Sequence, residues 1–194
     1  MKKLILIAAP PASGKTYVAE KIAASLPGVV YLDKDDLGDL MRAAFRASGE
    51  GVDMDGNFYI ENLRGAEYAT ILHIAFSSLR FSDCVILNAP FGKEVRDSEY
   101  MRALRERANA TGAELILIWV STPLKTIFER MKARASDRDT KKLEEWESYS
   151  RKINYTPPTD LIRGGVDSFL LFDNSNEECF ESSLEQALNL IQNR

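Results

Sequence analysis

An eight-residue segment near the amino terminus has the residue types and spacing of a phosphate-binding loop. Residues 9–16 read Ala-Pro-Pro-Ala-Ser-Gly-Lys-Thr, follow the apolar run Leu4 to Ala8, and open a helical pattern. Unpaired backbone N–H groups at a helix start, together with the helix dipole, attract a polyphosphate. Lys15 adds a cation for the β and γ oxygens, and the Thr16 hydroxyl suits Mg²⁺. This segment, the phosphate loop, therefore predicts a nucleotide phosphate site.

The phosphate loop departs from the strict motif at two glycine positions. Ala9 replaces the first glycine, and Ala12 stands where many such loops carry another. Pro10 and Pro11 have no N–H to donate, so we expect the amides of the next five residues to form the anion cradle. The alternative is a chance Gly-Lys-Thr at a helix start. The candidate nucleotide-binding residues here are Pro11, Ala12, Ser13, Gly14, Lys15 and Thr16.

Three carboxylates follow the second apolar run of the chain. Asp33, Asp35 and Asp36 come directly after Tyr31 and Leu32, where a strand of an open α/β sheet would meet its ligand. A carboxylate there can orient Mg²⁺ or accept the proton of an attacking hydroxyl, which is typically worth ~10²–10⁴ in rate. We expect at least one of the three to act chemically. The alternative is that Asp35 or Asp36 only caps the following helix.

A basic segment lies farther along the chain. Arg130, Arg134 and Arg138 recur every four residues, so they share one side of a helix. Residues 125–152 hold nine basic and six acidic side chains, a surplus of +3 in a chain of net charge −4. We expect a basic lid that closes over the nucleotide and surrounds the transferring phosphate with cations. The alternative is a solvated helix with cations near its carboxyl end.

One amide side chain ends the third apolar run. Asn88 precedes Ala89 and Pro90, at the same sheet edge as the phosphate loop. It could hold a metal-bound water or a substrate hydroxyl. It is equally typical of a turn before a proline.

Apolar runs that alternate with helical patterns must position these groups. This alternation predicts a parallel sheet with helical crossovers. We expect helices at about 15–26, from Pro123 onward, and at about 177–191, and irregular segments at 47–57 and 154–167. The predicted strands lie at about 3–9, 29–32, 84–88, 114–120 and 168–172.

The composition fits one α/β domain. At 194 residues and 45% hydrophobic content, the chain can bury one substantial core, so we expect a single domain over residues 1–194. No apolar stretch approaches the ~20 residues that span a bilayer, and the first run is predicted to be a strand rather than a signal peptide. We therefore expect a cytoplasmic protein with no membrane partner. The net charge of −4 argues against nucleic-acid partners, including sequence-specific ones.

The histidine and cysteines predict no metal or redox centre. His73 is the only histidine, which excludes a zinc site built on several histidines, and its apolar neighbours favour a helix-packing role. Cys84 and Cys179 have the spacing of neither a metal site nor a redox pair, so we expect two buried thiols.

The motifs taken together resemble those of the small P-loop kinases. They are the phosphate loop, the Leu-Asp-Lys-Asp-Asp strand end, the Asn-Ala-Pro-Phe turn and the Glu-Arg-Met-x-x-Arg-x-x-x-Arg-Asp segment. This group includes adenylate kinase, gluconate kinase, chloramphenicol phosphotransferase, polynucleotide kinase and the zeta toxins. The chain is similar in particular to bacterial AAA-family or zeta-toxin-like ATP-binding proteins. The resemblance implies a three-layer α/β/α P-loop NTPase fold with a five-stranded parallel sheet of order 2-3-1-4-5. It also implies ATP and Mg²⁺, an acceptor-side insertion at about 37–80 and a helical lid at about 130–155.

The resemblance also implies roles for individual residues. Lys15 would bind phosphate, and Asp35 would activate the acceptor. Arg130 or Arg134 would flank the adenine, and Arg134 and Arg138 would reach the transferring phosphate. Gly38 stands where polynucleotide kinases place a substrate arginine, so we do not expect a polynucleotide substrate. The candidate metal partners are Thr16 and Asp33, and the candidate substrate-binding residues are Asp33, Asp36 and Asn88.

The leading hypothesis is an ATP- and Mg²⁺-dependent kinase acting on a hydroxyl of a small molecule. The alternatives are an ATP-binding or ATP-hydrolysing switch and a zeta-toxin-like kinase of a nucleotide sugar. A GTPase is not favoured, because the Asn-Lys-x-Asp guanine signature is absent. The sequence leaves open the acceptor, the choice of base and the oligomeric state. The expected acceptor-side residues are Phe45, Phe58, Tyr59, Arg64 and Tyr68.

Overall fold

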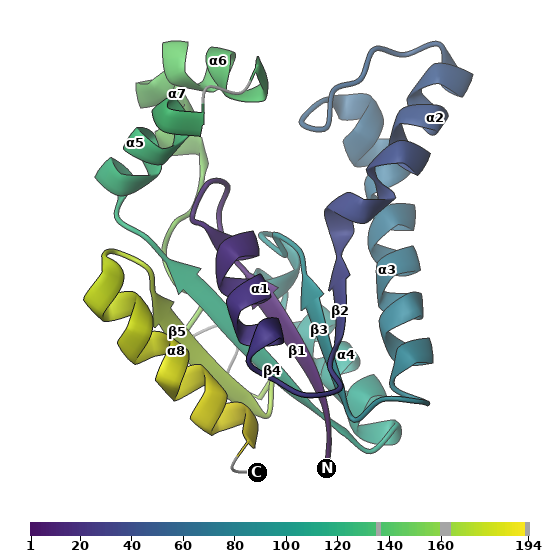
Figure 1. Cartoon of the computed structure of the whole chain (residues 1–194). Coiled ribbons are helices and arrows are strands. Elements are labelled where there is room, and N and C mark those ends of the chain that lie inside the picture. The colour runs from purple at the N-terminus through teal and green to yellow at the C-terminus, as the bar shows by residue number, and fades with distance from the viewer. Residues whose placement is uncertain (135–136, 160–163, 193–194) are drawn as a thin grey trace.

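Five parallel strands form the central sheet in the order β2-β3-β1-β4-β5, which confirms the expected topology (Figure 1). The structure is a computed structural model that describes residues 1–134, 137–159 and 164–192. The register pairs Asn88 with both Ile7 and Asp33, so the carboxyl ends of three strands meet at one edge. The strands are β1 (Lys2–Ala8), β2 (Val30–Asp33), β3 (Cys84–Asn88), β4 (Ala113–Ser121) and β5 (Ser168–Asp173).

Helices cover both faces of the sheet and give it a three-layer α/β/α architecture. Helices α1 (Lys15–Ala24) and α8 (Glu177–Gln192) pack on one face, and α3 (Arg64–Ser78) and α4 (Ser98–Ala110) pack on the other. Successive strand residues alternate between the two resulting cores, as a two-sided sheet requires. The strands are therefore nearly uniformly apolar, and their polar residues gather at the ends.

Two groups of helices extend beyond the carboxyl edge of the sheet, on either side of the phosphate loop (Figure 1). The α2 arm comprises a 3₁₀ turn (Lys34–Leu37), α2 (Gly38–Ser48), an irregular stretch and a π-helical turn (Tyr59–Leu63) that leads into α3. The lid helices are α5 (Leu124–Arg134), α6 (Asp137–Glu144) and α7 (Trp146–Lys152). A short 3₁₀ turn (Glu94–Arg96) precedes α4.

None of the helices in the described part of the chain has both the length and the apolar character that a membrane crossing needs. The strand bounds agree with the predictions to within one residue at either end. Two predictions about individual side chains are wrong. His73 is exposed, because the helical period turns it away from its buried neighbour Leu72. Cys84 and Cys179 are free thiols that are only partly buried.

Candidate active site

The phosphate loop joins β1 to α1 in a conformation that combines two left-handed residues. Gly14, at the start of α1, has φ +80°, and Ala12 has φ +61°. A residue with a Cβ adopts this region only at a cost of about 1 kcal/mol or more, so surrounding contacts must hold Ala12 in place.

The backbone carbonyl of Ser13 supplies those contacts. It accepts hydrogen bonds from Thr122 Oγ1 at 2.9 Å, Arg130 Nη1 at 3.3 Å and Asn174 Nδ2 at 2.8 Å. The three donors come from the end of β4, from α5 and from the end of β5. A Cβ at Gly14 would lie 2.5 Å from Asn174 Nδ2, so the side chain of Asn174 occupies the space that only glycine leaves free. The phosphate loop is thus braced by side chains that lie outside it in the sequence.

Asn88 links the three polar groups at the base of the phosphate loop. Its Oδ1 accepts a hydrogen bond from Lys15 Nζ at 2.5 Å. Its Nδ2 donates to Asp33 Oδ2 at 2.5 Å and to Thr16 Oγ1 at 3.2 Å. Asn88 is fully buried, and Tyr31 completes the network with a 3.2 Å hydrogen bond to Asp33. The turn-residue alternative for Asn88 therefore does not describe its main contacts.

Burial dominates the electrostatics of Lys15. It lowers the pKa of the ammonium group, and the charges of Asp33 and Asp35 partly oppose this shift. A partly buried cation whose pKa stays lowered beside two carboxylates is suited to an incoming anion, because a phosphate group would restore the favourable electrostatics that burial removes.

The three aspartates after β2 have different environments. Asp33 is buried, and its Oδ1 caps the 3₁₀ turn by accepting from the Asp35 amide at 2.9 Å. The side chain of Asp35 is 71% exposed and faces the phosphate loop across a cavity. Asp36 is exposed and lines none of the three cavities described below. The capping alternative was placed on the wrong residue. Leu37, the residue before α2, gives that helix no side-chain cap, and Asp33 caps the 3₁₀ turn instead.

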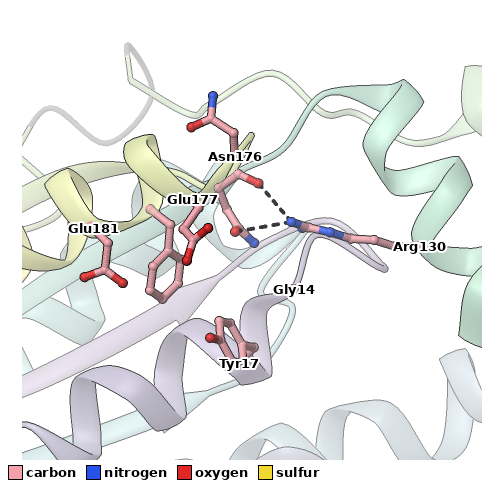
Figure 2. Close-up of a pocket in the computed structure, with 8 residues that line it drawn as sticks. Gly14, Tyr17, Arg130, Asn176, Glu177 and Glu181 are labelled. Carbon is pink, nitrogen blue, oxygen red and sulfur yellow. Dashed lines mark hydrogen bonds between the residues drawn. The ribbon is translucent and has the colours of Figure 1, made fainter.

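Two adjoining cavities lie along the phosphate loop. The phosphate cavity, about 280 Å³, is lined by residues 9–17 and by Asp35, Pro90 and side chains of the lid helices. The side cavity, about 430 Å³, shares Gly14 and Tyr17 with it and extends toward α8 (Figure 2). Further lining residues of the phosphate cavity are Met131, Arg134, Asp139 and Lys142, and those of the side cavity are Arg130, Asn174, Asn176, Glu177, Phe180 and Glu181.

The side cavity combines aromatic walls with polar groups at its edge. The rings of Tyr17 and Phe180 lie 5.3 Å apart. Figure 2 shows Arg130 reaching over Gly14 toward the segment after β5, where its Nη2 donates to the Asn174 carbonyl at 3.1 Å. Such a cavity is suited to a flat heterocycle with hydrogen-bonding edges.

The lid helices present fewer free cations to the phosphate cavity than the sequence predicts. Arg134 is paired with the buried Asp139 through Nε at 2.8 Å and Nη2 at 2.6 Å. Lys142 lines the cavity and forms a 3.0 Å ion pair with Asp55 of the α2 arm. Arg138 belongs to α6, but its side chain lies outside the described part of the structure. Arg130, in contrast, lies beside the side cavity.

A third cavity, about 210 Å³, lies on the other side of Asp35. We name it the Asp35 cavity. None of the five expected acceptor-side residues lines it: Phe45, Tyr59 and Tyr68 are buried, Phe58 packs on Phe45, and Arg64 pairs with Glu94 at 2.6 Å. Aromatic residues in this arm form its own small core instead. The lining residues are Lys34, Asp35, Gly38, Arg42, Val52, Met54 and Glu67.

Sequence reasoning did not single out several of these side chains. Asn174 follows β5 at the same edge of the sheet as Asn88, and this position in the sequence could have identified it as a candidate site residue. Tyr17 and Phe180 each look like one aromatic residue of an amphipathic helix. Lys142 and Asp139 are ordinary members of a charged segment until the fold brings them to the phosphate cavity.

The sheet order and the braced loop define the P-loop NTPase fold. Residues 4–155 match the family described as an AAA domain, and the chain belongs to that family. No curated protein matches the chain.

Solved structures of kinases share this fold with the chain. A provisionally assigned kinase from Chloroflexus aurantiacus is 21% identical, with a TM-score of 0.66, over 99% of this chain and 97% of the other. A sugar kinase from a Janibacter species is 16% identical, with a TM-score of 0.58, over 98% and 95%. APS kinase from Mycobacterium tuberculosis, in complex with AMPPNP and APS, is 20% identical, with a TM-score of 0.53, over 98% of both chains.

Proposed function

We propose that this protein is an ATP-dependent kinase that transfers the γ-phosphoryl group to a hydroxyl of a small molecule. One observation carries the proposal: Asp35 lines both the phosphate cavity and the Asp35 cavity. A carboxylate at the boundary between two cavities is placed to accept a proton from one ligand as it attacks the other. The kinase structures that share this fold support the same reaction class.

The two cavities along the phosphate loop suit the two parts of ATP. The side cavity would take the purine, against the rings of Tyr17 and Phe180 and beside the Arg130 guanidinium. The phosphate cavity would take the triphosphate, with the amides at the start of α1 and the Lys15 ammonium group as its donors.

The reaction follows from this placement. The acceptor hydroxyl oxygen forms a bond to the γ-phosphorus, its proton passes to the Asp35 carboxylate, and the bond from the γ-phosphorus to the β,γ-bridging oxygen breaks to release ADP. Lys15 and Lys142 stabilise the negative charge on the transferring group from two sides. Arg134 joins them if it exchanges Asp139 for phosphate.

The donor set near Thr16 fits a magnesium ion. The Thr16 hydroxyl and the Asp33 carboxylate both lie within hydrogen-bonding distance of one amide nitrogen, Asn88 Nδ2, and hard oxygen donors are what Mg²⁺ prefers. Thr16 and Asp33 would hold the ion, which would neutralise part of the charge of the triphosphate.

Two measurements on the purified chain test this function. Thermal unfolding with Mg²⁺ and ATP at ~100 times the dissociation constant should show ~2.7 kcal/mol of stabilisation that Lys15→Ala removes. ADP release should then depend on an added hydroxyl compound. If ATP binds but no acceptor from a broad panel stimulates ADP release, the chain is instead a nucleotide-binding switch. Absence of ATP binding would contradict both.

A further inference from the structure

The Asp35 cavity is lined by two cations and two carboxylates, and only the ion pair of Lys34 with Glu67 is buried. The side chain of Asp35, 3.5 Å from Lys34, is 71% exposed, and that of Arg42 is 54% exposed. Glu67 is 1% exposed, and its carboxylate accepts a hydrogen bond from Lys34 at 3.1 Å and another from Tyr59. This leaves Asp35 and Arg42 as the charged groups of the cavity that face solution.

Arg42 occupies the space left by the absent side chain of Gly38. A Cβ at Gly38 would lie 3.3 Å from Arg42 Nη1, so the guanidinium folds back one helical turn over the start of α2. Its ion-pair partner is Asp39 at 2.6 Å, and the side chains of the two are 54% and 96% exposed. Such an exposed pair is weak and exchanges readily for another anion.

We infer that the phosphoryl acceptor is a small hydroxyl compound that also carries an anionic group, a carboxylate or a phosphate, and that Arg42 binds this group. The inference rests on the proposed function. The hydroxyl faces Asp35, the anionic group meets the planar donors of the guanidinium, and Val52 and Met54 contact the carbon skeleton between them.

The same charges argue against an amine-bearing acceptor. Glu67 is already paired, so an ammonium group in the Asp35 cavity would bind Asp35 and remove the base from the reaction. Other carboxylates of the α2 arm, such as Asp53 and Asp55, are exposed and are screened by salt. The attraction of an anionic group in direct contact with the Arg42 guanidinium is therefore stronger than its repulsion by these exposed carboxylates.

Nuclear magnetic resonance of the arginine Nε–Hε groups tests the inference with the protein bound to Mg²⁺ and a non-hydrolysable ATP analogue. Arg42→Lys assigns the Arg42 signal. Each anionic probe is compared with a neutral compound of the same carbon skeleton. D-gluconate is compared with D-glucitol, and D-glycerate and glycerol 3-phosphate are both compared with glycerol. We expect at least one anionic member to shift the Arg42 signal saturably, while its neutral partner does not.

Affinity measurements on variants complete the test. For the anionic probe that binds, Arg42→Ala should weaken binding at least tenfold, and Gly38→Ala, which crowds the guanidinium, should weaken it severalfold. Arg46→Ala, an exposed arginine one turn farther along α2, is the matched control and should change nothing. An Arg42 signal that no anionic probe moves, or that the neutral partners move equally, overturns the inference. Failure of the ATP analogue to bind counts against the proposed function instead, because that step depends on Lys15.

Discussion

The ammonium group of Lys15 lies 2.5 Å from Oδ1 of Asn88, so the end of β3 positions this cation. The same amide donates to Asp33 at 2.5 Å. Asn88 therefore separates a cation from a carboxylate and contacts both. Neither a purely acidic nor a purely apolar residue could make both contacts.

Replacement of Asn88 should expose this double role. Asn88→Ala leaves buried polar groups unpaired and should cost about 1–3 kcal/mol of unfolding free energy. Asn88→Asp keeps an acceptor for Lys15 but loses the donor to Asp33 and Thr16, and it sets two carboxylates against each other, so it should also destabilise the fold. Urea unfolding measures both variants, and a wild-type unfolding free energy for either one would contradict the double role.

Lys15 should reduce the stability of the nucleotide-free protein. Burial lowers its pKa below the ordinary 10.5, so between the two values the unfolded chain binds more protons and stability rises with pH. The cost of this partly buried cation is largest below the lowered pKa and falls as pH rises toward 10.5. The stability that Lys15→Met gains over the wild type should therefore shrink as the pH is raised toward 10.5. If the difference in unfolding free energy between Lys15→Met and the wild type grew with pH, this prediction would be wrong.

Asp35 and Asp36 form a natural pair of test and control. Both are exposed neighbours, but only Asp35 lines the phosphate cavity and the Asp35 cavity. Asp35→Asn should lower kcat by ~10²–10⁴ without weakening ATP binding, and Asp36→Asn should retain near-normal turnover. Steady-state kinetics with calorimetric ATP titration separates the two effects. Equal kcat values for the two variants would remove Asp35 from the role of base.

Tyr17 should contribute to purine binding but not to triphosphate binding. Its ring is 53% exposed, so Tyr17→Ala should change stability little. Loss of one aromatic contact should weaken ATP binding by ~3–10-fold. Inorganic tripolyphosphate would occupy the phosphate cavity, which Tyr17 also lines but to which its neutral ring adds no charge, so its affinity should stay nearly unchanged. Equal weakening of both ligands would show that the side cavity is not the purine site.

The ion pair between Lys142 and Asp55 connects the lid helices to the α2 arm. The Asp55 side chain is 77% exposed and that of Lys142 is 24% exposed, and ion pairs open to solvent on one side contribute little to stability, so Lys142→Ala and Asp55→Ala should each change the unfolding free energy by less than about 1 kcal/mol. The two variants should differ in turnover. Lys142→Ala removes a cation from the phosphate cavity and should lower kcat by about tenfold or more, whereas Asp55→Ala keeps that cation. Identical kcat values for the two variants would show that Lys142 acts only in the contact between the lid helices and the α2 arm.

The sequence predicted the scaffold well because its signals are local. Continuous apolar runs and the phosphate loop identify buried parallel strands and the first helix start, and family resemblance supplied the strand order. The cavities were less predictable. Arg42 looks like a surface helix residue until Gly38 leaves room for its guanidinium, and Asn174 reaches the phosphate loop across 161 positions of sequence. His73 was predicted to pack inside the fold and is exposed instead, because apolar neighbours in the sequence do not decide which way a helical residue points.

The three hydrogen bonds to the Ser13 carbonyl also bear on how such proteins are recognised in genomes. A loop braced by distant side chains keeps its shape after glycines at positions 9 and 12 are lost. Surveys that demand those glycines will therefore pass over chains of this kind.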